Sequence, residues 1–371
     1  MLVPSFALSV YLSSTDLDAL AACLDAFNPA RLVLAREASN LEVKDLAARI
    51  GTTPSAISQF EHGAAKPKIE TLLRLALAVG VPPEFFAAAA PPSLPEAHCH
   101  FRRRRGATKR EQRYVLARGQ LVQEVVHYLA DYLEFPAEGI SALSRPAMTL
   151  DEAEALASAV RDAWGLGFGP ISDMVGLLEA YGVIPVEVQG HSERLDAFSV
   201  WAGGRPMVFL STDSRSGSRR RFDAAHELGH LIAHRDCMVG DPGLEDVANR
   251  FASAFLLPAN PFRAECPTRL SWPMLRTLKR RWGVSLQAIV RRAFDLGVYS
   301  EATYRRAYVQ IGQYGWRTQE PDEPSFEHPS LIQHGVAQLE RHGHAPAKIA
   351  ETLRHGDRLF SQVVWPNGRA E

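Results

Sequence analysis

The segment 219–234, RRRFDAAHELGHLIAH, is the part of the chain that most restricts its possible folds. If the segment forms a helix, His226 and His230 lie one turn apart on the same side, where two imidazoles can bind one metal ion. Glu227 projects beside them, as the general base of a metal-dependent hydrolase does. The alternative is a core helix whose histidines bind no metal. A metal site here requires an intact helix and a further ligand from elsewhere.

The third ligand is expected outside this segment. A helix rises about 1.5 Å per residue, so His226 and His234 lie about 12 Å apart along the axis and cannot share one ion. We therefore expect His234 to contact a backbone or carboxylate group beside the site, or to lie at the surface. Glu245 begins the next helical segment, EDVANRFASAFLLP, and is the expected third ligand. Weaker candidates are Asp236, Cys237 and Asp246, and the adjacent residues of HCH at 98–100 cannot all converge on one ion.

A second motif lies between residues 41 and 63, where two short helices are joined by a tight turn. Gly51 is expected to end the first helix, and Thr53 to cap the second, which starts at Pro54. The inner faces carry Leu46, Ala47 and Ile57, and the outer face of the second helix carries Ser55, Ser58 and Gln59. This arrangement allows the second helix to lie in a DNA major groove, although a plain helical bundle would show the same pattern.

The whole pattern predicts an α+β, mostly helical protein. Three β-rich segments, VIPVEVQ, AFSVWA and PMVFLS, precede the HELGH helix, and GGR between the last two indicates a hairpin. We therefore expect a zincin-like metallopeptidase domain with a small antiparallel sheet. The predicted domains are an N-terminal extension (1–27), a five-helix-type helix-turn-helix domain (28–90), a linker and helical connector (91–169), the metallopeptidase domain (170–317) and a helical C-terminal tail (318–371).

Composition adds few constraints. The formal net charge is −1, so only local charge can indicate a partner; the cluster Arg102–Arg105 fits either phosphate contacts or a solvated face. The four cysteines form no C-x-x-C pair, which argues against a disulfide framework and a Cys-rich zinc site. No apolar run approaches the roughly 20 residues of a membrane span. We expect a cytoplasmic, nucleoid-associated protein with no membrane partner.

The segment LEVKDLAARIGTTPSAISQFEHGAAKPKIETLLRLALAVGVPPEFF resembles the lambda-repressor-like (XRE) helix-turn-helix family. The resemblance implies binding to double-stranded operator DNA, with two-fold pairing of the protein on a palindromic site. It places base contacts at Ser55, Ser58 and Gln59, and phosphate contacts near Lys44 and Thr53. The family usually opens its first motif helix with Thr-Gln. Here Glu42-Val43 stands there, which we expect to remove a cap and a polar contact, and Pro54 replaces a common base-reading residue.

The segments RRFDAAHELGHLIAH and EDVANRFASAFLLP resemble the ImmA/IrrE metallo-endopeptidase family. The resemblance implies Zn²⁺ bound by His226, His230 and Glu245, with Glu227 catalytic, and a protein substrate such as a repressor or antitoxin. Tyr181, His191 and Arg221 are candidates for stabilising the oxyanion. Two alternatives stay open: a regulator whose peptidase-like domain senses a ligand or partner without proteolysis, and the toxin half of a toxin–antitoxin pair.

Overall fold

The computed structural model describes residues 14–91, 94, 108–188, 197–212, 216–235 and 242–368. The chain forms two compact units: residues 1–93, 108–133 and 332–371 make up the first, and residues 94–107 and 134–331 the second. Both units are mainly helical and the second contains a small sheet, which confirms the predicted fold class. The five domain ranges predicted above follow one another along the chain, whereas each compact unit combines segments that are far apart in the sequence. The five ranges therefore remain a prediction.

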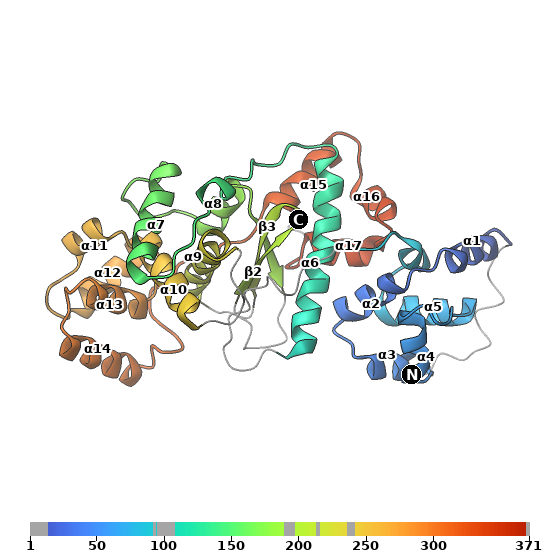
Figure 1. Ribbon diagram of the computed structural model, residues 1–371, viewed down its shortest axis with the longest axis horizontal. Helices are drawn as coiled ribbons and strands as arrows, with labels where there is room; N and C mark the ends of the chain where they lie inside the picture. The colour runs from blue at the N-terminus through green and yellow to red at the C-terminus, as the bar shows by residue number, and fades with distance from the viewer. Residues whose placement is uncertain are drawn as a thin grey trace. The chain divides into compact units, whose positions relative to one another are not determined.

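The first unit consists of helices (Figure 1). Its elements are α1 (Ser14–Asp25), α2 (Pro29–Ala38), α3 (Val43–Ile50), α4 (Pro54–Glu61), α5 (Ile69–Val79), the 3₁₀ turn η1 (Pro83–Ala87), the long α6 (Lys109–Ala130), α15 (Leu331–Arg341), α16 (Pro346–Thr352) and α17 (Gly356–Val364). Helix α1 falls in the range predicted as an extension. It packs on α5 and η1, with Leu20 and Cys23 buried.

The turn between α3 and α4 is built as predicted. Gly51 ends α3 with a φ of 69°, a left-handed conformation that glycine adopts without steric cost. The Thr53 hydroxyl accepts a hydrogen bond from the backbone N–H of Ala56, and Pro54 occupies the first turn of α4. Leu46, Ala47 and Ile57 are at most 1% exposed. The apolar spacing along the sequence therefore identified the inner faces of both helices.

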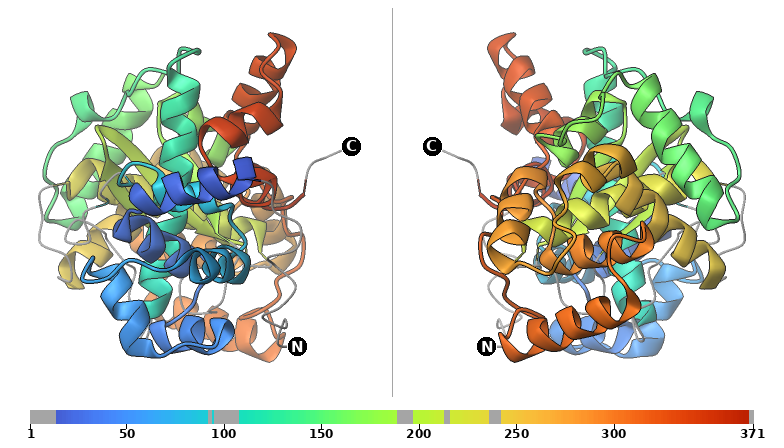
Figure 2. Two further views of the ribbon diagram at one scale, coloured as in Figure 1. Left: turned by 90° about the vertical axis from the view of Figure 1, so that its right-hand side faces the viewer. Right: turned by 90° about the vertical axis from the view of Figure 1, so that its left-hand side faces the viewer.

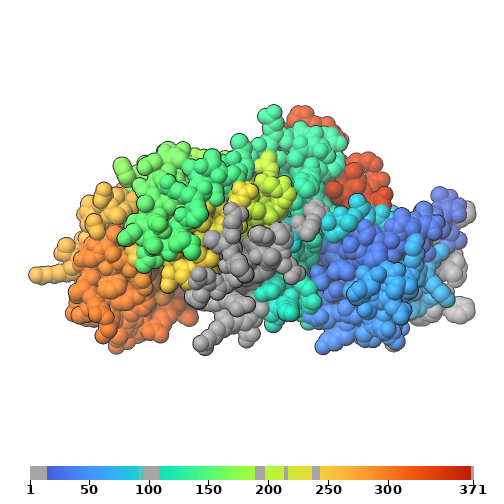
Figure 3. Space-filling model, viewed as in Figure 1, coloured from blue at the N-terminus to red at the C-terminus, as the bar shows by residue number. Residues whose placement is uncertain are grey.

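The second unit places helices around a three-stranded sheet. Its elements are the 3₁₀ turn η3 (Ser141–Leu143), α7 (Leu150–Ala163), α8 (Met174–Ala180), β1 (Ile184–Val188), β2 (Ala197–Ala202), β3 (Arg205–Ser211), α9 (Gly217–Ala233), α10 (Pro242–Leu256), α11 (Ala259–Glu265), α12 (Trp272–Trp282), α13 (Leu286–Asp295) and α14 (Glu301–Gln313). Helix α9 packs on β2 and β3, and α10 packs on α9 and α7. Helices α11 to α14, in orange, gather on one side of this unit (Figure 2) and adjoin α7 on its surface (Figure 3).

The sheet corrects one detail of the prediction, because it is mixed and not wholly antiparallel. The predicted hairpin is present: β2 pairs antiparallel with β3, with Ala202 opposite Arg205. However, β1 pairs with β3 in parallel, which gives the order β1-β3-β2. The chain therefore runs in one direction in β1 and β3 and in the opposite direction in β2. Strand β3 is thus central, and β2 is an edge strand.

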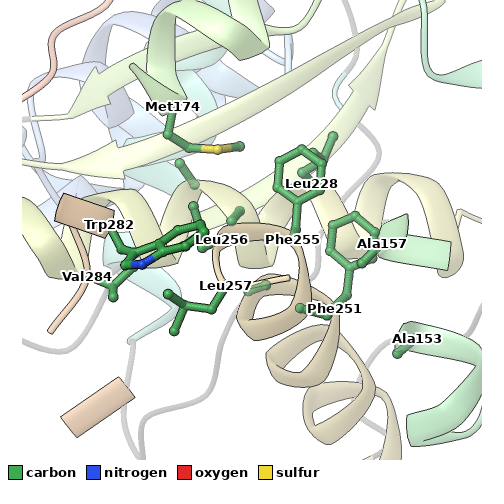
Figure 4. Packing of buried hydrophobic residues seen from close by; sticks show 14 of the residues in the cluster. Ala153, Ala157, Met174, Leu228, Phe251, Phe255, Leu256, Leu257, Trp282 and Val284 are labelled. Atoms are coloured by element: carbon green, nitrogen blue, oxygen red, sulfur yellow. The ribbon is translucent and has the colours of Figure 1, made fainter. Parts of the chain in front are cut away.

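Aromatic and aliphatic side chains of α10 fill the core beside α9. The rings of Phe251 and Phe255 are stacked with centroids 5.5 Å apart (Figure 4). Gly229 of α9 faces Phe251: a Cβ at residue 229 would lie 3.0 Å from Phe251 Cδ1. The glycine inside HELGH therefore allows the two helices to approach closely.

The predicted C-terminal tail carries the helices α15, α16 and α17 and begins with a segment that is not helical. Residues 318–330 contain no helix, and Pro321, Pro324 and Pro329 explain this, because proline lacks the N–H that an internal helical turn needs. Three glutamates of this segment accept backbone N–H groups at the starts of helices: Glu320 at α13, Glu323 at α9 and Glu327 at α8. The segment, which we call the acidic strap (residues 318–330), thus holds the N-terminal end of the HELGH helix.

The strap also neutralises a buried charge. Lys279 of α12 is fully buried, and its Nζ donates to Glu320 Oε2 at 2.7 Å and to Glu323. Burial alone would raise the pKa of Glu323, but the Lys279 ammonium and the Ser218 N–H outweigh it and hold the pKa below its usual value.

Across the described residues, no helix combines the length and the apolar composition that crossing a membrane requires.

Replacing Glu323 by Gln should destabilise the protein by about 2 kcal/mol. This is below the roughly 3–5 kcal/mol of a fully broken buried pair, because Glu320 still contacts Lys279. Urea unfolding at pH 7 measures the difference. It should begin to shrink as the pH falls below about 4.3, the ordinary pKa of glutamate, where the unfolded chain takes up a proton, and it should vanish once the pH falls through the lower folded pKa and the folded wild type is protonated too. The matched control is E301Q, which removes an exposed partner of Arg305 and should leave stability unchanged. Equal stability of E323Q and wild type at pH 7 would contradict this role of the strap.

Candidate functional site

Three predicted ligands converge where α9 meets α10. The Nε2 atoms of His226 and His230 are 3.1 Å apart. Glu245 reaches across from α10, with one carboxylate oxygen 3.5 Å from His226 Nε2 and the other 3.4 Å from His230 Nε2. Among the described residues, these three form the one group of three or more His, Cys, Asp or Glu side chains that could hold a metal ion, with donor atoms within 4.8 Å of one another.

The donor set suits zinc. Two imidazole nitrogens and one carboxylate oxygen are the ligands of many catalytic zinc sites, which keep a fourth position for water or substrate. His226 Nδ1 lies 3.1 Å from Asn249 Oδ1, which leaves Nε2 as the nitrogen that faces the other ligands. Both histidines are at most 1% exposed, whereas the Glu245 side chain is 37% exposed. The cluster therefore reaches solvent on the side of Glu245.

Glu245 is held as a carboxylate. Burial by itself would raise its pKa, but hydrogen bonds and charge interactions with His226 and His230 outweigh burial and lower the pKa well below its usual range. A negative charge beside two imidazoles favours a bound cation.

Glu227 lies next to this cluster on α9 and is fully buried. Its Oε2 accepts a hydrogen bond of 2.8 Å from the Ser199 hydroxyl, which comes from β2. The packing of α9 against β2 therefore positions the carboxylate that the sequence indicated as a general base.

Ser199 and Asn249 were not predicted from the sequence. Asn249 follows Glu245 by four residues on the same helix, so helical spacing alone could have placed it one turn further along the same face. Ser199 gives a weaker signal: it is a polar residue within the apolar strand AFSVWA, and only the sheet shows that it faces α9.

The other predicted site residues lie as follows. His234 ends α9 and is fully buried, so it does not lie at the surface. Asp246 is exposed on α10 and outside the metal-ligand group. Tyr181 donates its hydroxyl to the carbonyl of Trp164 and stacks on that ring, and Arg221 pairs with Glu327 of the strap. His98–His100, Arg102–Arg105, His191, Asp236 and Cys237 lie outside the described residues.

The predicted DNA contacts lie on α3, α4 and the turn between them. Lys44, Thr53, Ser55 and Gln59 are exposed, as a DNA-reading surface requires. Ser58 is half-buried, with its Oγ 3.4 Å from His62 Nδ1. The contacts of these residues with DNA stay predictions.

One expectation about this surface was wrong. Glu42 does not leave α3 without a cap, because the Asp45 carboxylate accepts a hydrogen bond of 3.0 Å from the Glu42 N–H. Arg113 of α6 also donates to the Glu42 carboxylate, at 3.1 Å. With Glu42-Val43 in place of Thr-Gln, the start of α3 therefore still has a capping hydrogen bond. Arg113 offsets the negative charge that Glu42 adds.

Comparison with known families agrees with both parts of this description. Residues 179–294 match the IrrE N-terminal-like domain, a peptidase family, and residues 32–86 match the helix-turn-helix family. The first range contains His226, Glu227, His230 and Glu245, and the second contains α3 and α4. The search of curated proteins found no match. The chain therefore combines a helix-turn-helix segment of the XRE type with an IrrE/ImmA-like peptidase-family segment.

Proposed function

We propose that the protein is a DNA-binding transcription regulator with zinc-dependent endopeptidase activity. Its proposed substrate is a regulatory protein, such as a repressor or an antitoxin, whose cleavage changes transcription in a stress or mobile-element response. The main support is the convergence of His226, His230 and Glu245 beside the buried carboxylate of Glu227. The proposed setting is the cytoplasm, where the protein binds a palindromic operator as a homodimer.

In this proposal, His226, His230 and Glu245 hold the zinc ion. When bound there, zinc supplies a Lewis acid that polarises the scissile carbonyl and acidifies water near neutral pH. Glu227 acts as general base and then as general acid: its carboxylate takes a proton from the attacking water and returns it to the leaving amine. Ser199 restrains the Glu227 side chain during both transfers, since its hydroxyl donates to Oε2.

The substrate is proposed to bind as an added strand on β2. Strand β3 lies in the middle of the sheet, so among the described residues β2 is the strand of the predicted hairpin that pairs on one side alone. An edge strand offers backbone N–H and C=O groups to an extended peptide. Ser199, whose hydroxyl restrains Glu227, belongs to β2. A peptide paired with β2 would therefore lie beside the strand that carries this serine.

Replacing Glu227 by Gln should abolish cleavage and keep zinc. The amide has the size of the carboxylate and can accept from Ser199, but it cannot take a proton from water, so the cleavage rate should fall at least about 10²–10⁴-fold. The test incubates zinc-loaded wild type and E227Q with the products of adjacent genes and identifies fragments by mass spectrometry. Equal cleavage by both proteins would contradict the role of Glu227. If neither protein cleaves, and E227Q regulates transcription like the wild type, the non-proteolytic sensor replaces this proposal.

Replacing Gln59 by Ala should weaken operator binding by about 1–3 kcal/mol and relax the preference at one base position, because an exposed side chain of α4 would read a base edge.

Replacing Lys44 by Ala should weaken binding to all DNA sequences equally, because the proposed contact of Lys44 is to a phosphate. The slope of the logarithm of the binding constant against the logarithm of salt concentration should fall by about one. Fluorescence anisotropy against salt concentration measures both effects. The control is K348A, which changes an exposed lysine of α16. An unchanged base preference in Q59A would contradict the proposed reading helix.

A further inference from the structure

A pocket of about 620 Å³ lies in the second unit, between residues of the segment 268–272, at the start of α12, and one face of α14. Thr303, Arg306 and Gln310 line it from α14, at a spacing of three and four residues that places them on one face of the helix. Tyr314, directly after α14, also lines it. The volume falls within the range of small-molecule sites, about 300–1,000 Å³. The pocket shares no residue with the metal-ligand cluster and is a second candidate site.

The pocket presents positive charge and hydrogen-bond donors. Arg269 and Arg306 line it from different elements, and both are exposed. In the part of the chain that the structure describes, neither guanidinium has an acidic partner, and no aspartate or glutamate lines the pocket. Each guanidinium carries five N–H donors in a fork that matches phosphate and carboxylate groups. The pocket therefore suits an anion.

Gln310 adds a donor whose identity is fixed by its neighbour. The indole N–H of Trp272 donates to Gln310 Oε1 at 2.8 Å. Because an indole N–H only donates, this bond identifies which end of the amide is the oxygen. Within the described segments the amide NH2 group of Gln310 has no acceptor, so it is available to a ligand in the pocket that Gln310 lines.

Two aromatic rings form the less polar part of the lining. Trp272 and Tyr314 have ring centroids 6.1 Å apart, with planes at 83°. Trp316 packs on both rings, with its centroid 5.2 Å from that of Trp272 and 4.7 Å from that of Tyr314. These contacts hold the rings in place, and Tyr314 is nevertheless 52% exposed. An exposed aromatic ring that its neighbours restrain offers a face on which a flat ring of a ligand stacks.

We propose that this pocket binds a nucleoside monophosphate, with its phosphate between Arg269 and Arg306 and its base against Tyr314. A phosphate monoester carries a charge of about −1.5 to −2 at pH 7, which matches two arginines, whereas a carboxylate would leave one of them uncompensated. The base supplies the flat ring. This site goes beyond the proposed function, because it shares no residue with the metal site and its ligand is neither a protein nor operator DNA.

Isothermal titration calorimetry of the full-length protein with AMP, GMP, CMP and UMP tests the proposal. At least one nucleotide should bind with one molecule per chain, and with equal affinity in zinc-loaded and metal-free protein, because the pocket is separate from the metal ligands. Inorganic phosphate lacks the ring and the matching nucleoside lacks the charge, so each should bind at least about 10-fold more weakly. No binding of any nucleotide, or equally tight binding of inorganic phosphate, would overturn the proposal.

Two adjacent arginines of α14 provide a matched pair of variants. R306A removes a guanidinium that lines the pocket and should lower nucleotide affinity about 10–100-fold, as the loss of hydrogen bonds to a charged group does. R305A removes the same charge from the neighbouring residue, which pairs with Glu301 and does not line the pocket, so it should bind like wild type. Equal losses in the two variants would indicate a general effect of charge and would overturn the proposal.

Replacing Tyr314 by Ala separates the ring from the charge. Y314A should weaken nucleotide binding about 10-fold and leave the affinity for inorganic phosphate unchanged, because stacking involves the base alone. Wild-type nucleotide affinity in Y314A would contradict the contact between the base and this ring. These readouts require neither zinc nor proteolysis, so a failure of the proposed peptidase function would leave them unaffected.

Discussion

The close approach of α10 to α9 at Gly229 is the contact on which the site depends. Phe251 lies against this glycine, and Glu245 and Asn249 precede Phe251 on the same helix. Because a helix is stiff over this length, the contact at Gly229 sets how far Glu245 reaches toward His226 and His230. A Cβ at residue 229 would press on the Phe251 side chain, which would have to give by a few tenths of an ångström.

Helix α9 is almost entirely buried, so its ends need partners within the protein. Glu323 of the acidic strap supplies an acceptor for the N–H of Ser218 at the first turn. At the other end, Ser144 donates to the Ile232 carbonyl. Two segments more than 170 residues apart therefore fix the helix that carries His226, Glu227 and His230. Such polar restraint stabilises one placement of α9, which apolar packing alone would leave less well defined.

The parts of the fold that were predictable from the sequence follow from local chemistry. Gly51, Thr53 and Pro54 act within a few residues of their own position, and the spacing of His226 and His230 depends only on helix geometry. Parts that depend on distant segments were not predictable in this way. The parallel pairing of β1 with β3, the strap across the helix starts and the contact of His234 with Ala147 each join residues that no local pattern connects.

His226, His230 and Glu245 are proposed to hold one zinc ion. Zinc K-edge X-ray absorption of the loaded protein tests this most directly. The predicted spectrum shows nitrogen and oxygen ligands at about 2.0–2.2 Å, two of them imidazoles, and one imidazole is lost in His230→Ala. A sulfur ligand at about 2.3 Å, or a spectrum unchanged in His230→Ala, would contradict the account.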